Sequence, residues 1–205
     1  ENIIVKESLE TKRNKKRKLT VAELTFLQNQ GVELRNAEKA RIFQKQEMEN
    51  LTVLHSQNYY YTFSKVCIAS DHAGYFLKEK IKDFFIKKNL PIIDLGPLSE
   101  NSVDYPDYAK KVAKRLVLKK SDAGILVCGS GTGMAITANK YKGIRAAQCY
   151  SKKSTILSRQ HNNSNIICIG ARMIKKKEAF NFINYFLNTK FEKGRHQKRV
   201  NKINI

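Results

Sequence analysis

The sequence has no apolar run that approaches the roughly 18 residues needed for a membrane-spanning helix. It also has no CxxC pair and no Cys/His spacing typical of a zinc site. Three of the four cysteines lie in or at the end of apolar, strand-like runs. We therefore expect a cytoplasmic protein with reduced thiols, without a membrane segment or a structural zinc ion. The cysteines are Cys67, Cys128, Cys149 and Cys168.

Acidic residues are scarce, because 18 Asp and Glu face 39 Lys and Arg, and the formal charge is +21. Such an excess usually indicates a nucleic-acid or anionic-membrane partner. Lysine dominates the basic residues, however, and the region expected to fold has no aromatic and basic strand of the kind that stacks single-stranded bases. The composition thus disfavours nucleic acid as the principal ligand.

Two regions of the chain differ in composition and in the pattern of their apolar residues. Residues 1–62 carry the basic run KRNKKRK and then apolar residues at roughly helical spacing, interrupted by Gly31. Thr20 and Glu23 form a capping-box pattern at the start of this stretch. We expect an N-terminal extension that is helical or disordered, of unknown function, on a main domain of residues 63–205.

The main domain alternates short apolar runs with segments of helical spacing. This alternation predicts an α/β fold, a doubly wound three-layer α/β/α (Rossmann-like) arrangement with a five-stranded, mainly parallel sheet. The loops after parallel strands meet at the carboxyl edge of the sheet, where such folds bind ligands. The five expected strands lie in KVCIAS, PIIDLG, AGILVCG, GIRAAQC and SNIICIG.

The loop CGSGTG after the third expected strand places Gly129, Gly131 and Gly133 at alternate positions before a helix. Such a loop presents several backbone N–H groups and a helix dipole to an anion. It lacks the Lys-Ser/Thr of a P-loop and the GxGxxG spacing of a dinucleotide site. A plain tight turn is the alternative.

Cys128 comes immediately before these amides. A thiol in that position can act as a nucleophile or a base. The commoner role for a lone cysteine is a small buried residue at the end of a strand, so spacing alone leaves both interpretations open.

Two further loops carry polar candidates. Asp71 and His72 end the first expected strand, at a corner where both side chains can reach a ligand. His161 and Asn162 lie near the end of an expected helix, where His161 can serve as a general acid or base. A helix-capping role for Asn162 or Asn163 is the alternative.

Arg195, His196 and Arg199 follow one another at helical spacing in GRHQKRV. Arginine guanidinium groups suit a phosphate dianion, although a solvated basic helix face is the more usual meaning of such a run.

The motifs together resemble one family. Their order and spacing are similar to those of type B ribose-5-phosphate isomerases, a family that includes the subunits of galactose-6-phosphate isomerase. The resemblance runs from about Lys65 to Ile205. It is carried by ASDHAG, DYPDYA, CGSGTGMAITANK, GIRAA, SRQHNN with CIGAR, and GRHQKRV.

The resemblance implies an aldose–ketose isomerase of the non-oxidative pentose phosphate pathway that needs no metal or organic cofactor. It makes Cys128 the base that moves a proton between C1 and C2. Some members use instead a glutamate just after the last loop glycine. Met134 occupies that position here, so the chain is similar to the cysteine-using branch.

The other roles also follow from the resemblance. His161 would open the sugar ring, Asp71 would lie near the ring oxygens, Asn162 would hold the sugar or the enediolate, and Ser130 would contribute its hydroxyl. The oxyanion site would consist of the amides from Gly129 through Gly131 and Thr132 to Gly133. The phosphate ligands would be Arg172, Arg195, Arg199 and His72 or His196.

The family builds its site between two subunits, and the resemblance implies that His161 and Arg172 come from the partner. A homodimer, or a tetramer of such dimers, is therefore expected, with a sugar phosphate as the substrate. A six-carbon substrate such as galactose or allose 6-phosphate is one alternative. A non-catalytic protein that binds nucleic acid or a partner through its basic N-terminus is another.

Overall fold

A five-stranded sheet, parallel throughout, forms the centre of the computed structural model, which describes residues 62–203. The strand order is β2-β1-β3-β5-β4, so the chain leaves β1 for one edge at β2 and then builds the other half, where β5 lies between β3 and the edge strand β4. This confirms the predicted doubly wound sheet. The strands are β1 (Val66–Ser70), β2 (Ile92–Asp94), β3 (Ala123–Cys128), β4 (Ala146–Gln148) and β5 (Ile166–Gly170).

The three central strands are buried along their whole length, whereas the short edge strands β2 and β4 are partly exposed. Their near-continuous apolar sequences, VCIAS, AGILVC and IICIG, suit strands that are covered on both faces. The same runs made these strands predictable from the sequence.

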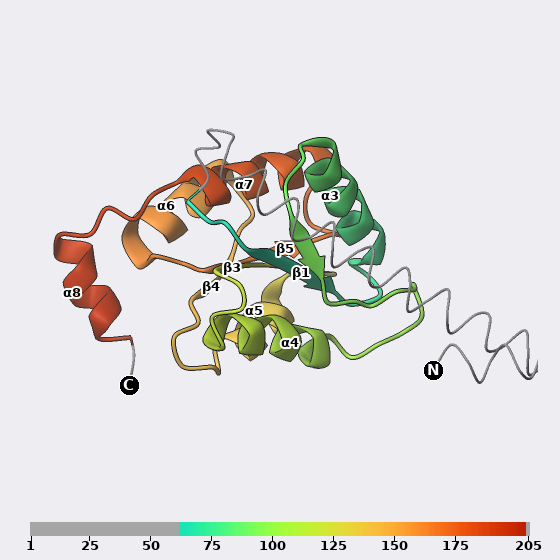
Figure 1. Cartoon of the computed structure of the whole chain (residues 1–205), viewed down its shortest axis with the longest axis horizontal. Coiled ribbons are helices and arrows are strands. Elements are labelled where there is room, and N and C mark those ends of the chain that lie inside the picture. The colour runs from blue at the N-terminus through green and yellow to red at the C-terminus, as the bar shows by residue number, and fades with distance from the viewer. Residues whose placement is uncertain (1–61, 204–205) are drawn as a thin grey trace, which may run out of the picture. The chain divides into compact units, whose positions relative to one another are not determined.

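Helices cover both faces of the sheet, which confirms the three-layer architecture (Figure 1). One apolar core joins α3 and α7 to the sheet, and a second joins α4 and α5 to the other face. Helix α6 packs on α7, and α8 packs on α6. The helices are α3 (Tyr75–Lys87), α4 (Tyr105–Val117), α5 (Thr132–Ala138), α6 (Lys152–Asn162), α7 (Lys176–Asn188) and α8 (Arg195–Asn201).

Local sequence signals set several helix ends. Asn89 adopts a left-handed backbone with φ of 52° just after α3, a conformation that commonly ends a helix. The side chains and backbone N–H groups of Ser151 and Ser154 form a capping box at the start of α6. Asn163 caps the other end of α6 in a left-handed conformation, so the capping alternative holds for Asn163. Asn162 is the last residue of the helix.

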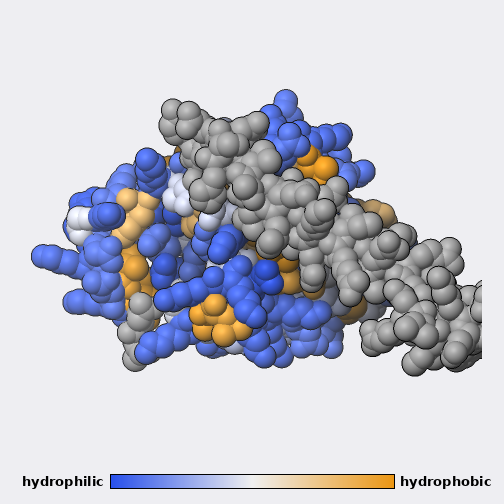
Figure 2. All heavy atoms as spheres, viewed as in Figure 1, coloured by the Kyte–Doolittle hydropathy of each residue, from blue (hydrophilic) through white to orange (hydrophobic). Residues whose placement is uncertain are grey.

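The predicted N-terminal extension lies, except for its last residue, outside the described residues. Within the part of the chain that the structure describes, no helix is both long and apolar enough to cross a membrane. The face of the domain in Figure 2 is largely hydrophilic, with separate hydrophobic patches.

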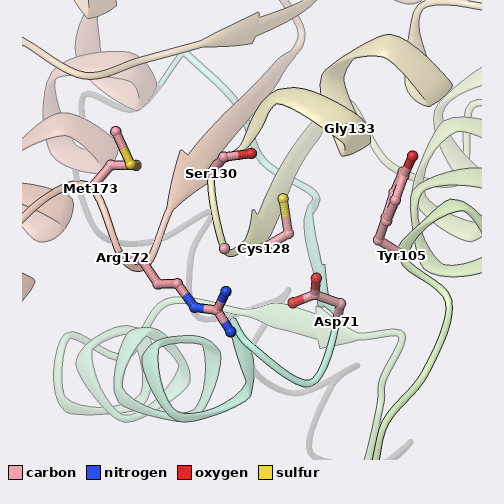
Figure 3. Close-up of a pocket in the computed structure, with 8 residues that line it drawn as sticks. Asp71, Tyr105, Cys128, Ser130, Gly133, Arg172 and Met173 are labelled. Carbon is pink, nitrogen blue, oxygen red and sulfur yellow. The ribbon is translucent and has the colours of Figure 1, made fainter.

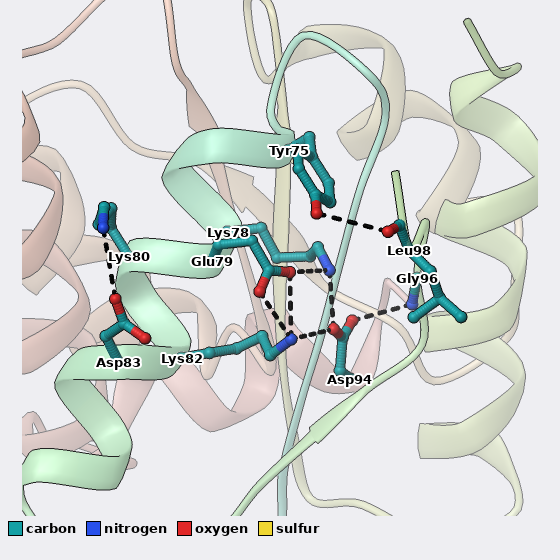
Figure 4. A network of polar contacts seen from close by, with 9 residues as sticks. All are labelled: Tyr75, Lys78, Glu79, Lys80, Lys82, Asp83, Asp94, Gly96 and Leu98. Atoms are coloured by element: carbon teal, nitrogen blue, oxygen red, sulfur yellow. Dashed lines mark hydrogen bonds and ion pairs between the residues drawn. The ribbon is translucent and has the colours of Figure 1, made fainter. Parts of the chain in front are cut away.

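An ion network ties α3 to β2 (Figure 4). The ammonium group of Lys78 is fully buried and lies 2.7 Å from a carboxylate oxygen of both Glu79 and Asp94. Lys82 Nζ lies 2.6 Å from Asp94 Oδ2 and 3.0 Å from Glu79 Oε2. Asp94 Oδ1 accepts the N–H of Gly96 at 2.9 Å. Two cations thus face two anions, and the network fixes the turn that leaves β2.

Replacing Asp94 with asparagine tests this network. The amide can still accept the Gly96 N–H, but the buried ammonium of Lys78 loses one of its two carboxylates. We expect a loss of about 3 kcal/mol in the free energy of unfolding, the lower end for a broken buried ion pair. Chemical denaturation measures it. Asp83→Asn, which breaks the exposed pair between Asp83 and Lys80, is the control and should change little. Equal losses in the two variants would contradict the buried network.

The effect of Asp94→Asn should depend on pH. Burial opposes ionisation of Asp94 and Glu79, but hydrogen bonds from Lys78 and Lys82 outweigh it and lower the pKa of both carboxyl groups. The stability that they contribute is complete above the unfolded-state pKa of about 4 and is lost as the pH falls through the lower folded value. The difference between wild type and variant should therefore shrink in acid.

Candidate functional site

The polar candidates meet where β1, β3 and β5 end. Cys128 pairs in register with Gly170, so β3 and β5 end side by side. Backbone hydrogen bonds extend the pairing of β3 with its neighbours β1 and β5 into the loops that follow these strands. The N–H of Asp71 donates to the carbonyl oxygen of Val127 at 3.1 Å, and the N–H of Arg172 donates to that of Gly129 at 3.0 Å. Asp71, Cys128 and Arg172 are thereby held on one edge of the sheet by backbone hydrogen bonds.

The glycine loop is confined by its neighbours as well as by its own backbone. Gly131 has a φ of +85°, and a Cβ there would lie 3.1 Å from the backbone of Ile169 and Gly170. A Cβ on Gly133 would lie 2.7 Å from the ring of Tyr105. Glycine is thus required at Gly131 by both conformation and space. The loop then opens directly into α5, with Gly131 as the N-cap.

The thiol of Cys128 is buried and turns back toward the loop. Its Sγ atom accepts the N–H of Gly131 at 3.0 Å. A donor therefore points to the atom that becomes negative when Cys128 loses its proton. This geometry combines a thiol and an oriented backbone N–H donor three residues apart.

A cavity of about 390 Å³ opens above the thiol. Figure 3 shows the guanidinium of Arg172 and the carboxylate of Asp71 below Cys128 and the ring of Tyr105 to its right. Asp71 Oδ1 also accepts the N–H of Gly74 at 2.8 Å, which fixes the carboxylate. The lining residues are Asp71, Tyr105, Cys128, Gly129, Ser130, Gly133, Arg172 and Met173.

His161 and Asn162 line a different cavity, of about 670 Å³, beside β4 and α6. The imidazole of His161 stacks on that of His196 in α8, with ring centroids 4.1 Å apart and planes inclined by 6°. Glu192 approaches both rings. Burial, together with the neighbouring His161 and Arg195, lowers the pKa of His196.

The structure thus divides the predicted site residues between two places in one chain. The first group contains the residues of the glycine loop together with Asp71, Cys128 and Arg172. Arg172 was expected to reach the partner's site together with His161. This expectation needs correction, because Arg172 lines the Cys128 cavity of its own chain. The register of β5 with β3 carries it there.

Two predicted residues take secondary positions. Thr132 does not line the cavity, but its N–H lies 3.3 Å from the hydroxyl of Ser130. The ring nitrogen Nδ1 of His72 lies 3.3 Å from the carbonyl oxygen and 3.4 Å from the N–H nitrogen of Val103, in the loop before α4.

The second group of predicted residues contains His161, Asn162, Arg195, His196 and Arg199, on α6 and α8.

The other three cysteines, Cys67, Cys149 and Cys168, lie in the core. Burial raises the pKa of Cys67 to about 11 and raises the pKa of Cys149 and Cys168 above the ordinary thiol value. They therefore remain protonated thiols at neutral pH and take no part in the site.

Three residues near these cavities were missed by sequence reasoning. Tyr105 belongs to the quoted motif DYPDYA and Met173 to GARM, so position after a strand or before a helix could have pointed to them. Glu192 carries no such signal, because it is one acidic residue in a basic stretch.

These features define a doubly wound α/β protein with a buried thiol and a glycine-rich loop at the carboxyl edge of its sheet. Residues 66–203 match the family model described as Ribose/Galactose Isomerase. The chain belongs to the ribose/galactose isomerase family, and the resemblance seen in its motifs is confirmed.

Relatives share both sequence and fold. Ribose-5-phosphate isomerase B of Escherichia coli is 40% identical over 139 residues, which cover 68% of this chain and 93% of that protein. The structure of a ribose 5-phosphate isomerase from Thermotoga maritima has a TM-score of 0.68 and 48% identity, over 69% of this chain and 97% of that one. Ribose-5-phosphate isomerase B from Mycoplasma genitalium, solved with bound ribulose-5-phosphate, has a TM-score of 0.64 and 42% identity, over 68% and 93% of the two chains.

The confinement of the loop can be tested with Gly131→Ala. The φ of +85° costs an L-residue about 1–2 kcal/mol, and the contact with the backbone of Ile169 and Gly170 adds to that loss. Gly143→Ala is the matched control, because Gly143 has a similar φ of +83° and no neighbour within 4 Å of a Cβ. Urea unfolding should show the larger loss for Gly131→Ala. Equal losses would mean that β5 does not confine the loop.

Proposed function

We propose that the chain interconverts D-ribose 5-phosphate and D-ribulose 5-phosphate, with Cys128 as the base. The observation that carries this proposal is the buried thiol of Cys128 hydrogen-bonded to the N–H of Gly131 in a cavity shared with Asp71 and Arg172. The bound ribulose-5-phosphate of the Mycoplasma genitalium relative supports a five-carbon substrate.

The reaction requires proton transfer between two adjacent carbons. In the proposed step, the thiolate of Cys128 accepts the proton from C2 of the open-chain aldose. The C–H electron pair forms a C1–C2 double bond, and the carbonyl oxygen at C1 takes the negative charge of the enediolate. Return of the proton to C1, with transfer of the O2 proton to O1, gives the ketose. Nothing is oxidised overall, so the step needs no external oxidant or reductant.

The loop amides divide between two tasks in this proposal. The N–H of Gly131 already contacts the Cys128 sulfur, so it supports charge on the base. The oxyanion of the enediolate then depends on the other amides of the loop, between Gly129 and Gly133. Backbone donors suit this task because they are fixed before the charge develops.

The remaining proposed roles draw on both groups of residues. Arg172 and Asp71 line the Cys128 cavity, where a guanidinium can hold a phosphate and a carboxylate can accept from sugar hydroxyls. His161 would open the ring, and Asn162 would hold the sugar. Arg195 and Arg199 are exposed on α8, free to engage a phosphate.

We further propose that the complete site forms between two subunits of a homodimer. The support is the division of the residues within one chain, with Cys128 and Arg172 at one cavity and His161 at another. A two-fold axis would bring the α6 and α8 group of one protomer to the Cys128 cavity of the other, twice per dimer. Such a reaction also suits a reducing, cytoplasmic compartment, since all four cysteines are free thiols.

An assay with ribose 5-phosphate, and in parallel with galactose and allose 6-phosphates, tests the activity. We expect turnover with the five-carbon phosphate to exceed turnover with the others, whether or not a chelator is present. Cys128→Ala should abolish isomerisation and the exchange of the C2 proton with solvent deuterium, while ribose 5-phosphate binding persists. Preference for a six-carbon phosphate would overturn the proposed substrate but not the proposed base.

The matched control for this variant is Cys149→Ala, which removes a buried thiol of the core and should keep its activity. Undiminished isomerisation by Cys128→Ala would show that another group is the base. Loss of activity in both variants would point to folding instead, which circular dichroism would reveal.

Intersubunit complementation tests the shared site. Cys128→Ala and His161→Gln should each be inactive alone. When the two are coexpressed, random pairing should restore about a quarter of the wild-type activity, because half of the dimers then carry one intact site of two. If all residues of a site came from one chain, the mixture would stay inactive.

A further inference from the structure

The glycine loop is bonded to the edge strand β4 by a side chain that the proposed function does not use. The carbonyl oxygen of Ser130 accepts the side-chain N–H of Gln148 at 2.9 Å. Gln148 is the last residue of β4, and β5 lies between β4 and β3. Gln148 also lines the cavity that contains His161 and Asn162. A hydrogen bond thus connects the loop beside Cys128 with the wall of the second cavity.

Gly170 leaves the space that this contact needs. A Cβ on Gly170 would lie 2.5 Å from the carbonyl oxygen of Ser130, so this oxygen lies against the end of β5. Gln148 pairs in register with Cys168, two residues before Gly170 on the same strand. Among the hydrogen bonds of residues 62–203, Gln148 supplies the donor to the Ser130 oxygen. An apolar side chain at position 148 would remove that donor.

The bond matters because of the peptide group to which this oxygen belongs. The peptide bond between Ser130 and Gly131 is trans, so its C=O and N–H point in opposite directions. The group that accepts from Gln148 at its oxygen therefore donates at its other end, through the N–H of Gly131, to Sγ of Cys128 at 3.0 Å. Successive hydrogen bonds polarise one another. A donor on the oxygen thus makes the N–H a better donor to a thiolate.

We propose that Gln148 is a positioning residue for the isomerisation, which aligns and polarises the Ser130–Gly131 peptide group toward the sulfur of Cys128. Gln148 acts through that peptide group, because it does not line the Cys128 cavity itself. The consequence for catalysis rests on the role of Cys128 as the base in the proposed function, whereas the effect on the thiol does not.

Replacing Gln148 with methionine tests the proposal. Gln148→Met removes the donor and keeps the length and the unbranched shape of the side chain. Gln148 is exposed, so water can replace part of its bond, and the effect should be moderate. At neutral pH we expect kcat for ribose 5-phosphate to fall about 2- to 5-fold, without a matching change in KM. Gln148→Glu should lose more, because its carboxylate oxygens cannot donate to the carbonyl oxygen of Ser130.

Asn188→Leu is the matched control. The exposed side chain of Asn188 also donates to a backbone carbonyl oxygen, that of Asn184 at 2.8 Å, but it lies on α7 and lines neither cavity. This variant loses the same kind of bond and should keep the wild-type kcat.

The pH dependence of Cys128 alkylation separates positioning from a purely structural role. Iodoacetamide reacts with the thiolate, and mass spectrometry of the peptide that contains Cys128 gives the rate. A weaker N–H donor stabilises the thiolate less, so the midpoint of the profile should move upward by about 0.3–0.5 pH unit in Gln148→Met. It should stay in place in Asn188→Leu. The other titratable or charged groups around the thiol are the same in all variants; they are Asp71, Tyr105, Cys168 and Arg172.

The two readouts are linked. The difference in kcat between wild type and Gln148→Met should shrink as the pH rises through the alkylation midpoint, because both thiols are then ionised. The proposal is overturned if Gln148→Met keeps the wild-type kcat and alkylation profile. It is also overturned if kcat falls while the midpoint stays in place, since that result indicates a structural role alone. A wild type inactive on every sugar phosphate would refute the proposed function, whereas a shifted alkylation midpoint would still support the effect of Gln148 on the thiol.

Discussion

The pairing of β3 with β5 is the constraint on which the rest of the structure depends. It ends at Cys128 opposite Gly170, and its hydrogen bonds continue into both loops through the N–H groups of Ala171 and Arg172. A Cβ on Gly170 would lie 2.5 Å from the carbonyl oxygen of Ser130, so the two loops cross almost in contact. Any shift of one strand would move the thiol, the amides and the guanidinium together. The backbone beneath the cavity is therefore held by the centre of the sheet.

Much of this arrangement follows from the sequence. The continuous apolar runs of β1, β3 and β5 predict buried parallel strands, and parallel strands bring their following loops to one edge. The glycines of the loop after Cys128 predict a backbone that approaches its neighbours closely. Both predictions depend on local patterns. This is why the fold, the loop and the association of Asp71 with Cys128 could be obtained without coordinates.

Other features depend on tertiary packing that no local pattern records. The sequence gives no sign that Arg172 lies beside Gly129, because that contact is set by the register of two strands about 40 residues apart. The resemblance to a family likewise misplaced Arg172 on the partner's side of the site. Glu192 was missed for the same reason, since it becomes notable only when α8 folds against α6 and brings two imidazoles to its carboxylate.

The predicted site residues on α6 and α8 are held in place by different contacts from those that hold the residues around Cys128. Arg159, one helical turn before Asn163, is buried with its guanidinium 4.4 Å from the ring centroid of Phe63 and 5.5 Å from that of Phe186. Its N–H groups donate to the carbonyl oxygens of Thr189 and Ser164. The bond to Thr189 fastens the end of α6 to the segment that leads from α7 toward α8, and the bond to Ser164 holds the turn that follows α6. The position of the end of α6, which carries His161, is thus supported by a buried cation and by the bond from the N–H of Glu192 to the carbonyl oxygen of Gln160, whereas that of Cys128 is supported by the sheet. Because the two supports are separate, a change in how α6 meets α8 alters the imidazoles without moving the thiol.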